Sequence, residues 1–161
     1  MNEWKTRQID FVLAFPQAKQ ECDMYMEIPR GCNVGGSKED YVLKLNKNLY
    51  GSKQASKLWY DYLKRGLRKR GFKQSKADKC VFYKGNTIFV IYVDDGILIG
   101  PNEKEIESII ESLKSEYDMT DEGDLNEYLG IKMERLSDGS RVLTQTIVDG
   151  TNIESGRIES K

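Results

Sequence analysis

Two adjacent carboxylates, Asp94 and Asp95, stand where two aliphatic runs meet. Residues 89–100 read Phe-Val-Ile-Tyr-Val-Asp-Asp-Gly-Ile-Leu-Ile-Gly, and both flanks of the acidic pair are typical of buried strands. A hairpin turn needs at most one aspartate for its own hydrogen bonds. The second carboxylate therefore either works together with another residue elsewhere in the chain, or is an additional acidic residue in a turn that does not need it.

A third carboxylate, Asp10, lies inside another hydrophobic segment, residues 7–15, for which we predict a buried strand closed by Pro16. An unpaired buried carboxylate is costly, so Asp10 also calls for a partner. Clustered carboxylates repel one another unless a cation lies among them, and their hard oxygens favour Mg²⁺ or Mn²⁺. Two such ions about 4 Å apart can activate a hydroxyl and stabilise a leaving oxygen in phosphoryl transfer. We predict that Asp10, Asp94 and Asp95 are catalytic metal ligands; the alternative is that the acidic pair serves only its turn.

The composition fits one globular domain and excludes several kinds of site. The chain has 161 residues, of which 39% are hydrophobic and 32% charged. It contains no histidine, and its three cysteines lack the CxxC spacing, which excludes zinc fingers and histidine-based triads. The polar N-terminus and the short apolar runs predict no signal peptide and no membrane span. We therefore expect an intracellular protein that is not secreted.

Hydrophobic periodicity predicts an α+β fold. The three-and-four spacing of apolar residues predicts helices over residues 52–71 and from Pro101 to Tyr117. After the strand at 7–15, strands are predicted at residues 80–83, 87–93, 96–100, 128–136 and 141–144, with turns at 84–86 and 138–139. Residues 16–50 are expected to be irregular, with short extended pieces at 24–28 and 41–45.

The order of the major elements is strand, helix, strand, strand, helix, strand, with residues 128–136 as the last strand. This order predicts the split βαβ, ferredoxin-like arrangement, in which the first strand runs beside the central hairpin. Asp10 would then approach the tip that carries Asp94 and Asp95.

Six blocks of the sequence follow one another in a characteristic order: QIDFVLAFPQA at 8–18, DMYMEIP at 23–29, NLYGSKQASKLWY at 48–60, DKCVF at 78–82, YVDD at 92–95 and YLGI at 128–131. Tyr92-Val93-Asp94-Asp95 resembles the YxDD box of reverse transcriptases. The other blocks are similar, in order and spacing, to the Ty1/copia class of retrotransposon reverse transcriptases. YxDD alone is only suggestive, whereas the ordered blocks together are specific, and they cover roughly residues 4–145.

The resemblance implies a fold and an activity. Residues 1–145 would form the ferredoxin-like palm of a right-hand polymerase, with a partial fingers insertion at about 16–50, and residues 146–161 would be a divergent, loose tail. The activity implied is RNA-directed DNA polymerisation, in which the primer 3′-hydroxyl attacks a deoxynucleotide with two Mg²⁺ ions, or Mn²⁺, as cofactors. Asp10 and Asp94 would bind both ions, and Asp95 would complete the acidic cluster.

The resemblance also implies roles in substrate binding. Phe15 falls where reverse transcriptases place the aromatic residue that excludes a ribose 2′-hydroxyl; the alternative is a plain core phenylalanine. The nucleotide-binding residues implied are Phe15, Tyr50, Gly51, Lys53 and Gln54. The residues implied for primer and template are Tyr92 and Val93, together with Lys64, Arg65, Arg68 and Lys69 of a basic segment. A solvent-facing helix surface explains that basic segment equally well.

The chain departs from the family pattern in ways that leave two functions open. Ser56-Lys57 stands where the family block has Pro-Arg, although no predicted metal ligand is affected. Little of the fingers precedes Asp10, and nothing after Leu143 is long enough for a thumb or an RNase H domain. We expect RNA template, DNA primer and deoxynucleotides as partners. Integrase and RNase H are expected elsewhere in an intact Gag-Pol polyprotein. The expected location is the cytoplasm or the nucleus. The alternative is an inactive remnant that binds nucleic acid weakly.

Overall fold

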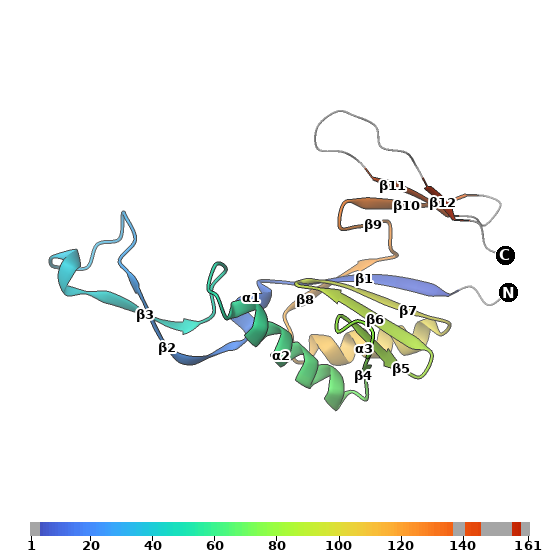
Figure 1. The fold of residues 1–161 in the computed structure, drawn as a ribbon, viewed down its shortest axis with the longest axis horizontal. Coiled ribbons are helices and arrows are strands. Elements are labelled where there is room, and N and C mark those ends of the chain that lie inside the picture. The colour runs from blue at the N-terminus through green and yellow to red at the C-terminus, as the bar shows by residue number, and fades with distance from the viewer. Residues whose placement is uncertain (1–3, 137–140, 146–155, 159–161) are drawn as a thin grey trace.

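The fold is α+β, as predicted. The structure is a computed structural model that describes residues 4–136, 141–145 and 156–158 (Figure 1). Its largest unit is a six-stranded antiparallel sheet with the order β4-β5-β6-β7-β1-β8. The strands of this sheet are β1 (Lys5–Phe11), β4 (Lys73–Gln74), β5 (Val81–Lys84), β6 (Thr87–Tyr92), β7 (Asp95–Gly100) and β8 (Met119–Gly123). None of the helices in the described part of the chain is long and apolar enough to cross a membrane.

Two amphipathic helices cover one face of this sheet, in the positions that the periodicity predicts. Helix α2 (Ala55–Lys69) buries Trp59, Leu63 and Leu67, and helix α3 (Glu103–Lys114) buries Ile106, Ile109, Ile110 and Leu113. Asn102 caps α3, because its side chain accepts a hydrogen bond from the Glu105 backbone N–H. The apolar faces of both helices share one core with Ile9, Phe11, Phe89 and Leu98 of the sheet.

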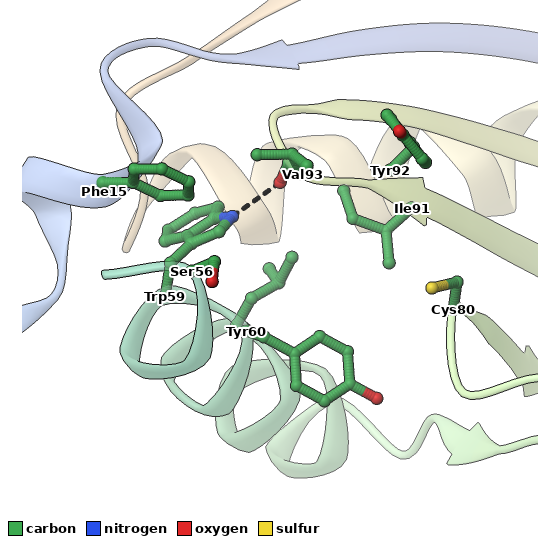
Figure 2. Close-up of a pocket in the computed structure, with 9 residues that line it drawn as sticks. Phe15, Ser56, Trp59, Tyr60, Cys80, Ile91, Tyr92 and Val93 are labelled. Carbon is green, nitrogen blue, oxygen red and sulfur yellow. Dashed lines mark hydrogen bonds between the residues drawn. The ribbon is translucent and has the colours of Figure 1, made fainter. Parts of the chain in front are cut away.

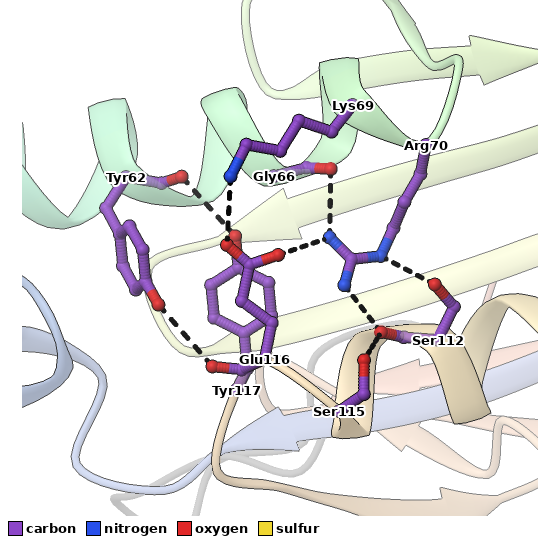
Figure 3. A network of polar contacts seen from close by, with 8 residues as sticks. All are labelled: Tyr62, Gly66, Lys69, Arg70, Ser112, Ser115, Glu116 and Tyr117. Carbon is purple, nitrogen blue, oxygen red and sulfur yellow. Dashed lines mark hydrogen bonds and ion pairs between the residues drawn. The ribbon is translucent and has the colours of Figure 1, made fainter.

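A polar network joins the ends of the two helices (Figure 3). The Arg70 guanidinium donates to Glu116 Oε2 at 2.8 Å, to Ser112 Oγ at 2.9 Å and to the Gly66 carbonyl at 3.0 Å. The Arg70 side chain is only 12% exposed, so these partners replace the water that the cation loses. The network fixes how α2 lies against α3 and therefore how both support the sheet.

The first strand ends earlier than predicted. We predicted a strand over residues 7–15, but β1 ends at Phe11 and a short helix, α1 (Ala14–Gln17), follows it. Leu13 adopts a left-handed φ of 48°, which turns the chain out of the sheet. The Gln17 side chain fixes this turn, because its Nε2 donates to the Val12 and Asp118 carbonyls.

The prediction for the last strand of the main sheet was also wrong. Residues 128–136 do not form one strand: β9 (Glu127–Tyr128) and β10 (Ile131–Arg135) are separated by a bend at which Leu129 and Gly130 have φ of 51° and 76°. They belong to a second sheet, of order β12-β11-β10-β9, with β11 (Arg141–Gln145) and β12 (Gly156–Ile158). Strand β8 completes the main sheet instead. The turn predicted at Asp138-Gly139 lies outside the described residues, and so do residues 146–155 and 159–161 of the predicted tail.

Residues 16–50 are more regular than predicted. Strand β2 (Lys19–Glu27) pairs with β3 (Val42–Lys47) as a two-stranded sheet, with a 3₁₀ turn, η1 (Lys38–Asp40), between them. This hairpin extends away from the main sheet (Figure 1). Its base is held by buried Asn48, whose Nδ2 donates to the Ala18 carbonyl at 3.1 Å.

Candidate active site

The main sheet brings the predicted carboxylates together. Strands β1 and β7 are antiparallel neighbours, and their register places Asp10 directly opposite Asp95. The Phe11 backbone N–H donates to the Asp94 carbonyl at 2.8 Å, which holds the tip of the β6–β7 hairpin against the end of β1. The prediction that Asp10 meets this hairpin tip is confirmed.

The acidic side chains lie on the sheet face that α2 and α3 leave open. Ile9 and Phe11 point into the core shared with the helices, so Asp10 between them points the other way. Directly opposed residues of paired strands share a face, and Asp95 pairs with both Asp10 and Tyr92. Asp10, Asp95 and Tyr92 therefore form one row across three strands.

Partial burial and the like charges of neighbouring carboxylates both raise the pKa values of the two aspartates in this row. Partial burial, followed by the nearby Asp94 and Glu122 carboxylates, raises the pKa of Asp10 above its ordinary value. Partial burial, followed by Asp94 and Asp10, raises the pKa of Asp95. Carboxylates that disfavour one another's ionisation are the arrangement that a divalent cation relieves.

Glu122 was missed by the sequence analysis. It lies on β8, next to β1, in a segment for which no strand was predicted. The only available signal was the run of acids after the second helix, which reads equally well as a solvent-facing loop.

The hairpin tip is a two-residue turn, Val93–Asp94, in an unfavourable backbone conformation. Val93 has a φ of 59°, which is rare for a β-branched residue and costs about 1–3 kcal/mol. Two hydrogen bonds hold the turn from opposite sides: the Phe11 N–H on the Asp94 carbonyl and the Trp59 indole N–H on the Val93 carbonyl, at 2.6 Å. The predicted primer-contacting residues at this tip, Tyr92 and Val93, are 57% and 40% exposed.

Two of the predicted nucleotide-binding residues, Phe15 and Tyr50, stack beside the acids. Their ring centroids are 4.4 Å apart. Partial burial raises the pKa of Tyr50, and the charges of Asp94 and Asp10 raise it further, which places the phenol within electrostatic reach of the carboxylates. Gly51 follows with a φ of 91°, a conformation that side chains rarely adopt, and open space surrounds the position where a Cβ would stand.

The other two residues of this predicted group lie differently. Lys53 is exposed. Gln54 is turned toward the β2–β3 hairpin, where its Nε2 contacts Met24 Sδ and Cys22 Sγ. The structure therefore gives Gln54 a local role at the base of that hairpin, and its nucleotide contact stays a prediction.

The basic residues predicted to bind primer and template lie on α2, in the layer behind the sheet. The Lys64 ammonium lies 5.6 Å from the Tyr60 ring centroid, and Lys69 pairs with Glu116 at 3.7 Å. Arg65 and Arg68 are exposed on the same helix. The helix layer covers the sheet face opposite the acidic row, so these residues and the carboxylates are not brought together.

A mostly apolar cavity of about 230 Å³ lies between α2 and the hairpin tip (Figure 2). Its lining residues are Phe15, Ser56, Trp59, Tyr60, Leu63, Cys80, Ile91, Tyr92 and Val93. Trp59, which donates to the Val93 carbonyl, thus also lines the cavity beside the turn.

Tyr128 is a further residue of the site that the sequence analysis left without a role. Its hydroxyl donates to the Asp95 carbonyl at 3.4 Å. Burial, followed by the charge of Asp95, raises the pKa of Tyr128 to about 12. Strand β9 therefore reaches the open face of the main sheet beside the acidic row.

The three aspartates have the ligand type that a hard divalent ion prefers, although their side chains are not yet arranged around one. Among the residues that the structure describes, no three Cys, Asp or Glu side chains are placed so that they could hold a metal ion as they stand. Asp10, Asp94 and Asp95 offer only oxygen ligands and are electrostatically coupled. Rotation of these partly exposed side chains would be needed to complete a ligand set.

The chain is similar in sequence to known reverse transcriptases. Residues 1–153 match the family described as reverse transcriptase (RNA-dependent DNA polymerase). The chain therefore belongs to this family, and its relatives confirm the resemblance to the Ty1/copia retrotransposon class. It is 34% identical over 136 residues to the retrovirus-related Pol polyprotein from transposon TNT 1-94 of Nicotiana tabacum, covering 81% of the chain and 10% of that polyprotein.

Yeast transposon proteins are also similar to most of the chain, and the chain again covers only part of their length. The putative transposon Ty5-1 protein of Saccharomyces cerevisiae is 28% identical over 140 residues, covering 84% of the chain and 45% of that protein. The Ty1-BL Gag-Pol polyprotein is 30% identical over 118 residues, covering 73% of the chain and 6% of that polyprotein. The chain thus spans a small part of the Pol polyproteins it matches. No solved structure matches it.

Replacing Asp10 by asparagine is expected to stabilise the metal-free protein. Because the folded-state pKa of Asp10 is raised from 3.8, folded protein holds this proton more tightly than unfolded chain, and stability falls as pH rises above that value. The Asp10→Asn variant escapes this loss. Thermal unfolding in EDTA should show its midpoint about 1–4 °C higher at pH 7, and the difference should disappear at about pH 3, below the unfolded-state pKa. A lower midpoint at pH 7 would show that Asp10 makes a net favourable contact in the metal-free fold.

Proposed function

We propose that the chain is the palm-centred part of an RNA-directed DNA polymerase that uses two Mg²⁺ ions. The observation that carries the proposal is the placement of Asp10 opposite the Asp94–Asp95 tip, on the sheet face without helices. The order β6-β7-β1-β8, with α2 and α3 on one face, supports a ferredoxin-like palm, and the β2–β3 hairpin supports a partial fingers insertion.

The three aspartates and the two residues before Asp94 have separate roles in this proposal. Asp10 and Asp94 would hold both ions and Asp95 would complete the cluster; Mn²⁺ would be accepted because the ligands are oxygens. The bound ions would activate the primer 3′-hydroxyl and neutralise charge on the phosphates during transfer. The exposed surfaces of Tyr92 and Val93 would receive the primer end.

The stacked Phe15 and Tyr50 rings would form one wall of the nucleotide site. The two rings are in contact, with centroids 4.4 Å apart, and together they present an aromatic surface beside the acids. Such a surface would reject a ribose 2′-hydroxyl by steric exclusion. Gly51, with no side chain, would let the substrate approach the backbone.

Primer extension tests the proposed activity. The purified chain is incubated with an RNA template, an annealed DNA primer and deoxynucleotides, with Mg²⁺ or with EDTA. We expect template-directed extension with Mg²⁺ and none with EDTA. Adding Mn²⁺ in excess over EDTA should restore extension. Binding of the template–primer without extension would contradict polymerase activity for this chain and would support the weak nucleic-acid binder that the sequence left open.

A further inference from the structure

Trp59 is the one residue of α2 whose side chain reaches the acidic hairpin tip with a polar atom in the described structure. The residue is 2% exposed, and its indole N–H lies at the edge of the core, where it donates to the Val93 carbonyl at 2.6 Å (Figure 2). An indole needs a partner for its N–H when it is buried, and a backbone carbonyl at the tip is the partner that this fold supplies. The bond joins the helix layer to the turn that carries Asp94.

The turn needs support because its own residues supply little. Val93 has a left-handed φ of 59°, which its branched side chain disfavours, and the side chain is too exposed to anchor the turn by burial. The Trp59 N–H holds the Val93 carbonyl, and the Phe11 N–H holds the Asp94 carbonyl at 2.8 Å. Two successive carbonyls of the turn are therefore fixed from two different elements.

The indole is itself rigidly held. Its ring centroid lies 5.1 Å from that of Phe11, with an interplanar angle of 67°, and 6.0 Å from that of Tyr117. Phe11 thus acts twice: its ring supports the indole and its N–H holds Asp94. A rigid donor loses little conformational freedom when it bonds, so it can maintain an unfavourable turn.

We propose that Trp59 is a positioning residue that holds the Val93–Asp94 turn so that Asp94 stays close to Asp10. This inference rests on the proposed function for its consequence in metal binding, but the positioning itself exists without any metal. It predicts that loss of the indole N–H loosens the turn first and weakens metal binding through that loosening.

The Trp59→Phe variant tests the proposal, because it keeps an aromatic ring in the core and removes the N–H. The matched control is Tyr62→Phe, which removes a hydroxyl from the same aromatic cluster without touching the turn. Hydrogen exchange of the Phe11 amide, followed by NMR in EDTA, reports on the turn directly. We expect exchange about three- to tenfold faster in Trp59→Phe and unchanged in Tyr62→Phe.

A second substitution separates positioning from general packing. In the Trp59→Phe background, Val93→Asn replaces the branched side chain by one that tolerates a left-handed φ, so it should restore part of the Phe11 protection. Mn²⁺ titration by electron paramagnetic resonance should show affinity falling about tenfold in Trp59→Phe, with the same partial recovery. Two results would overturn the proposal. One is equally faster exchange of the Phe11 amide in Trp59→Phe and Tyr62→Phe, and the other is no recovery of its protection when Val93→Asn is added to Trp59→Phe. If wild-type chain binds no Mn²⁺, the proposed function fails, whereas the exchange result still decides the role of Trp59.

Discussion

The Asp94→Asn variant is expected to lose about a thousandfold or more of Mg²⁺-dependent primer extension. Asparagine has the same shape as aspartate but no charge, so the change removes a ligand of both proposed ions without opening a cavity. Extension with Mg²⁺ is measured for the variant and the wild type under the same conditions. The loss should appear in the rate at saturating nucleotide, because the proposed mechanism uses the Asp94 charge for transfer and not for nucleotide stacking.

The fold should survive this substitution. Asp94 is held through its backbone carbonyl, which accepts from the Phe11 N–H, and asparagine keeps that carbonyl. The control is Asp61→Asn, which removes an equal charge from α2, in the layer behind the sheet. The control should extend primers at close to the wild-type rate. Wild-type activity in Asp94→Asn, with the Asp61→Asn variant also active, would remove the carboxylate from the mechanism.

The second large effect is expected at Gly66, on the buried face of α2. A Cβ at this position would lie 2.8 Å from Tyr117 Cζ and closer still to its hydroxyl. Tyr117 is 3% exposed and packs against the rings of Phe11, Trp59 and Tyr62, so it has little room to move. Overpacking should outweigh the gain of about 1 kcal/mol that alanine brings to a helix interior.

Urea unfolding should therefore show Gly66→Ala destabilised by about 1–3 kcal/mol. Adding Tyr117→Phe should recover part of the loss, because it removes the hydroxyl that the new methyl group meets. Tyr117→Phe alone serves as the control for the hydrogen bond that this hydroxyl donates to the Tyr62 carbonyl. A Gly66→Ala variant as stable as the wild type would mean that the aromatic cluster rearranges freely.

The meeting of Asp10 with the hairpin tip could be predicted from sequence because it depends on strong, local signals. Strand periodicity around both acidic segments, with a helix between them, matches the split βαβ arrangement, in which the first strand runs beside the central hairpin, as β1 does beside β7. The period of two then sends Asp10 away from the core that Ile9 and Phe11 enter. The approach of Asp10 to the acidic tip therefore follows from the predicted arrangement, whereas the exact register comes from the structure.

Other parts of the site depend on contacts that no local pattern reveals. Strand β8 reads Met-Thr-Asp-Glu-Gly, which has few residues typical of strands, and it forms because its backbone pairs with the far edge of β1. Glu122 was missed for that reason. The early end of β1 depends on Leu13 entering a left-handed conformation, which leucine rarely adopts. The Trp59–Val93 hydrogen bond joins residues 34 positions apart and appears only when the helix is packed.

The most direct measurement is a Mn²⁺ titration of the wild-type chain and the Asp94→Asn variant at pH 7.5, followed by electron paramagnetic resonance. If the acidic tip opposite Asp10 is a divalent-metal site, the wild type binds Mn²⁺, Mg²⁺ competes for the same site, and Asp94→Asn weakens binding about a hundredfold or more. Equal Mn²⁺ affinity in the wild type and Asp94→Asn would contradict the site.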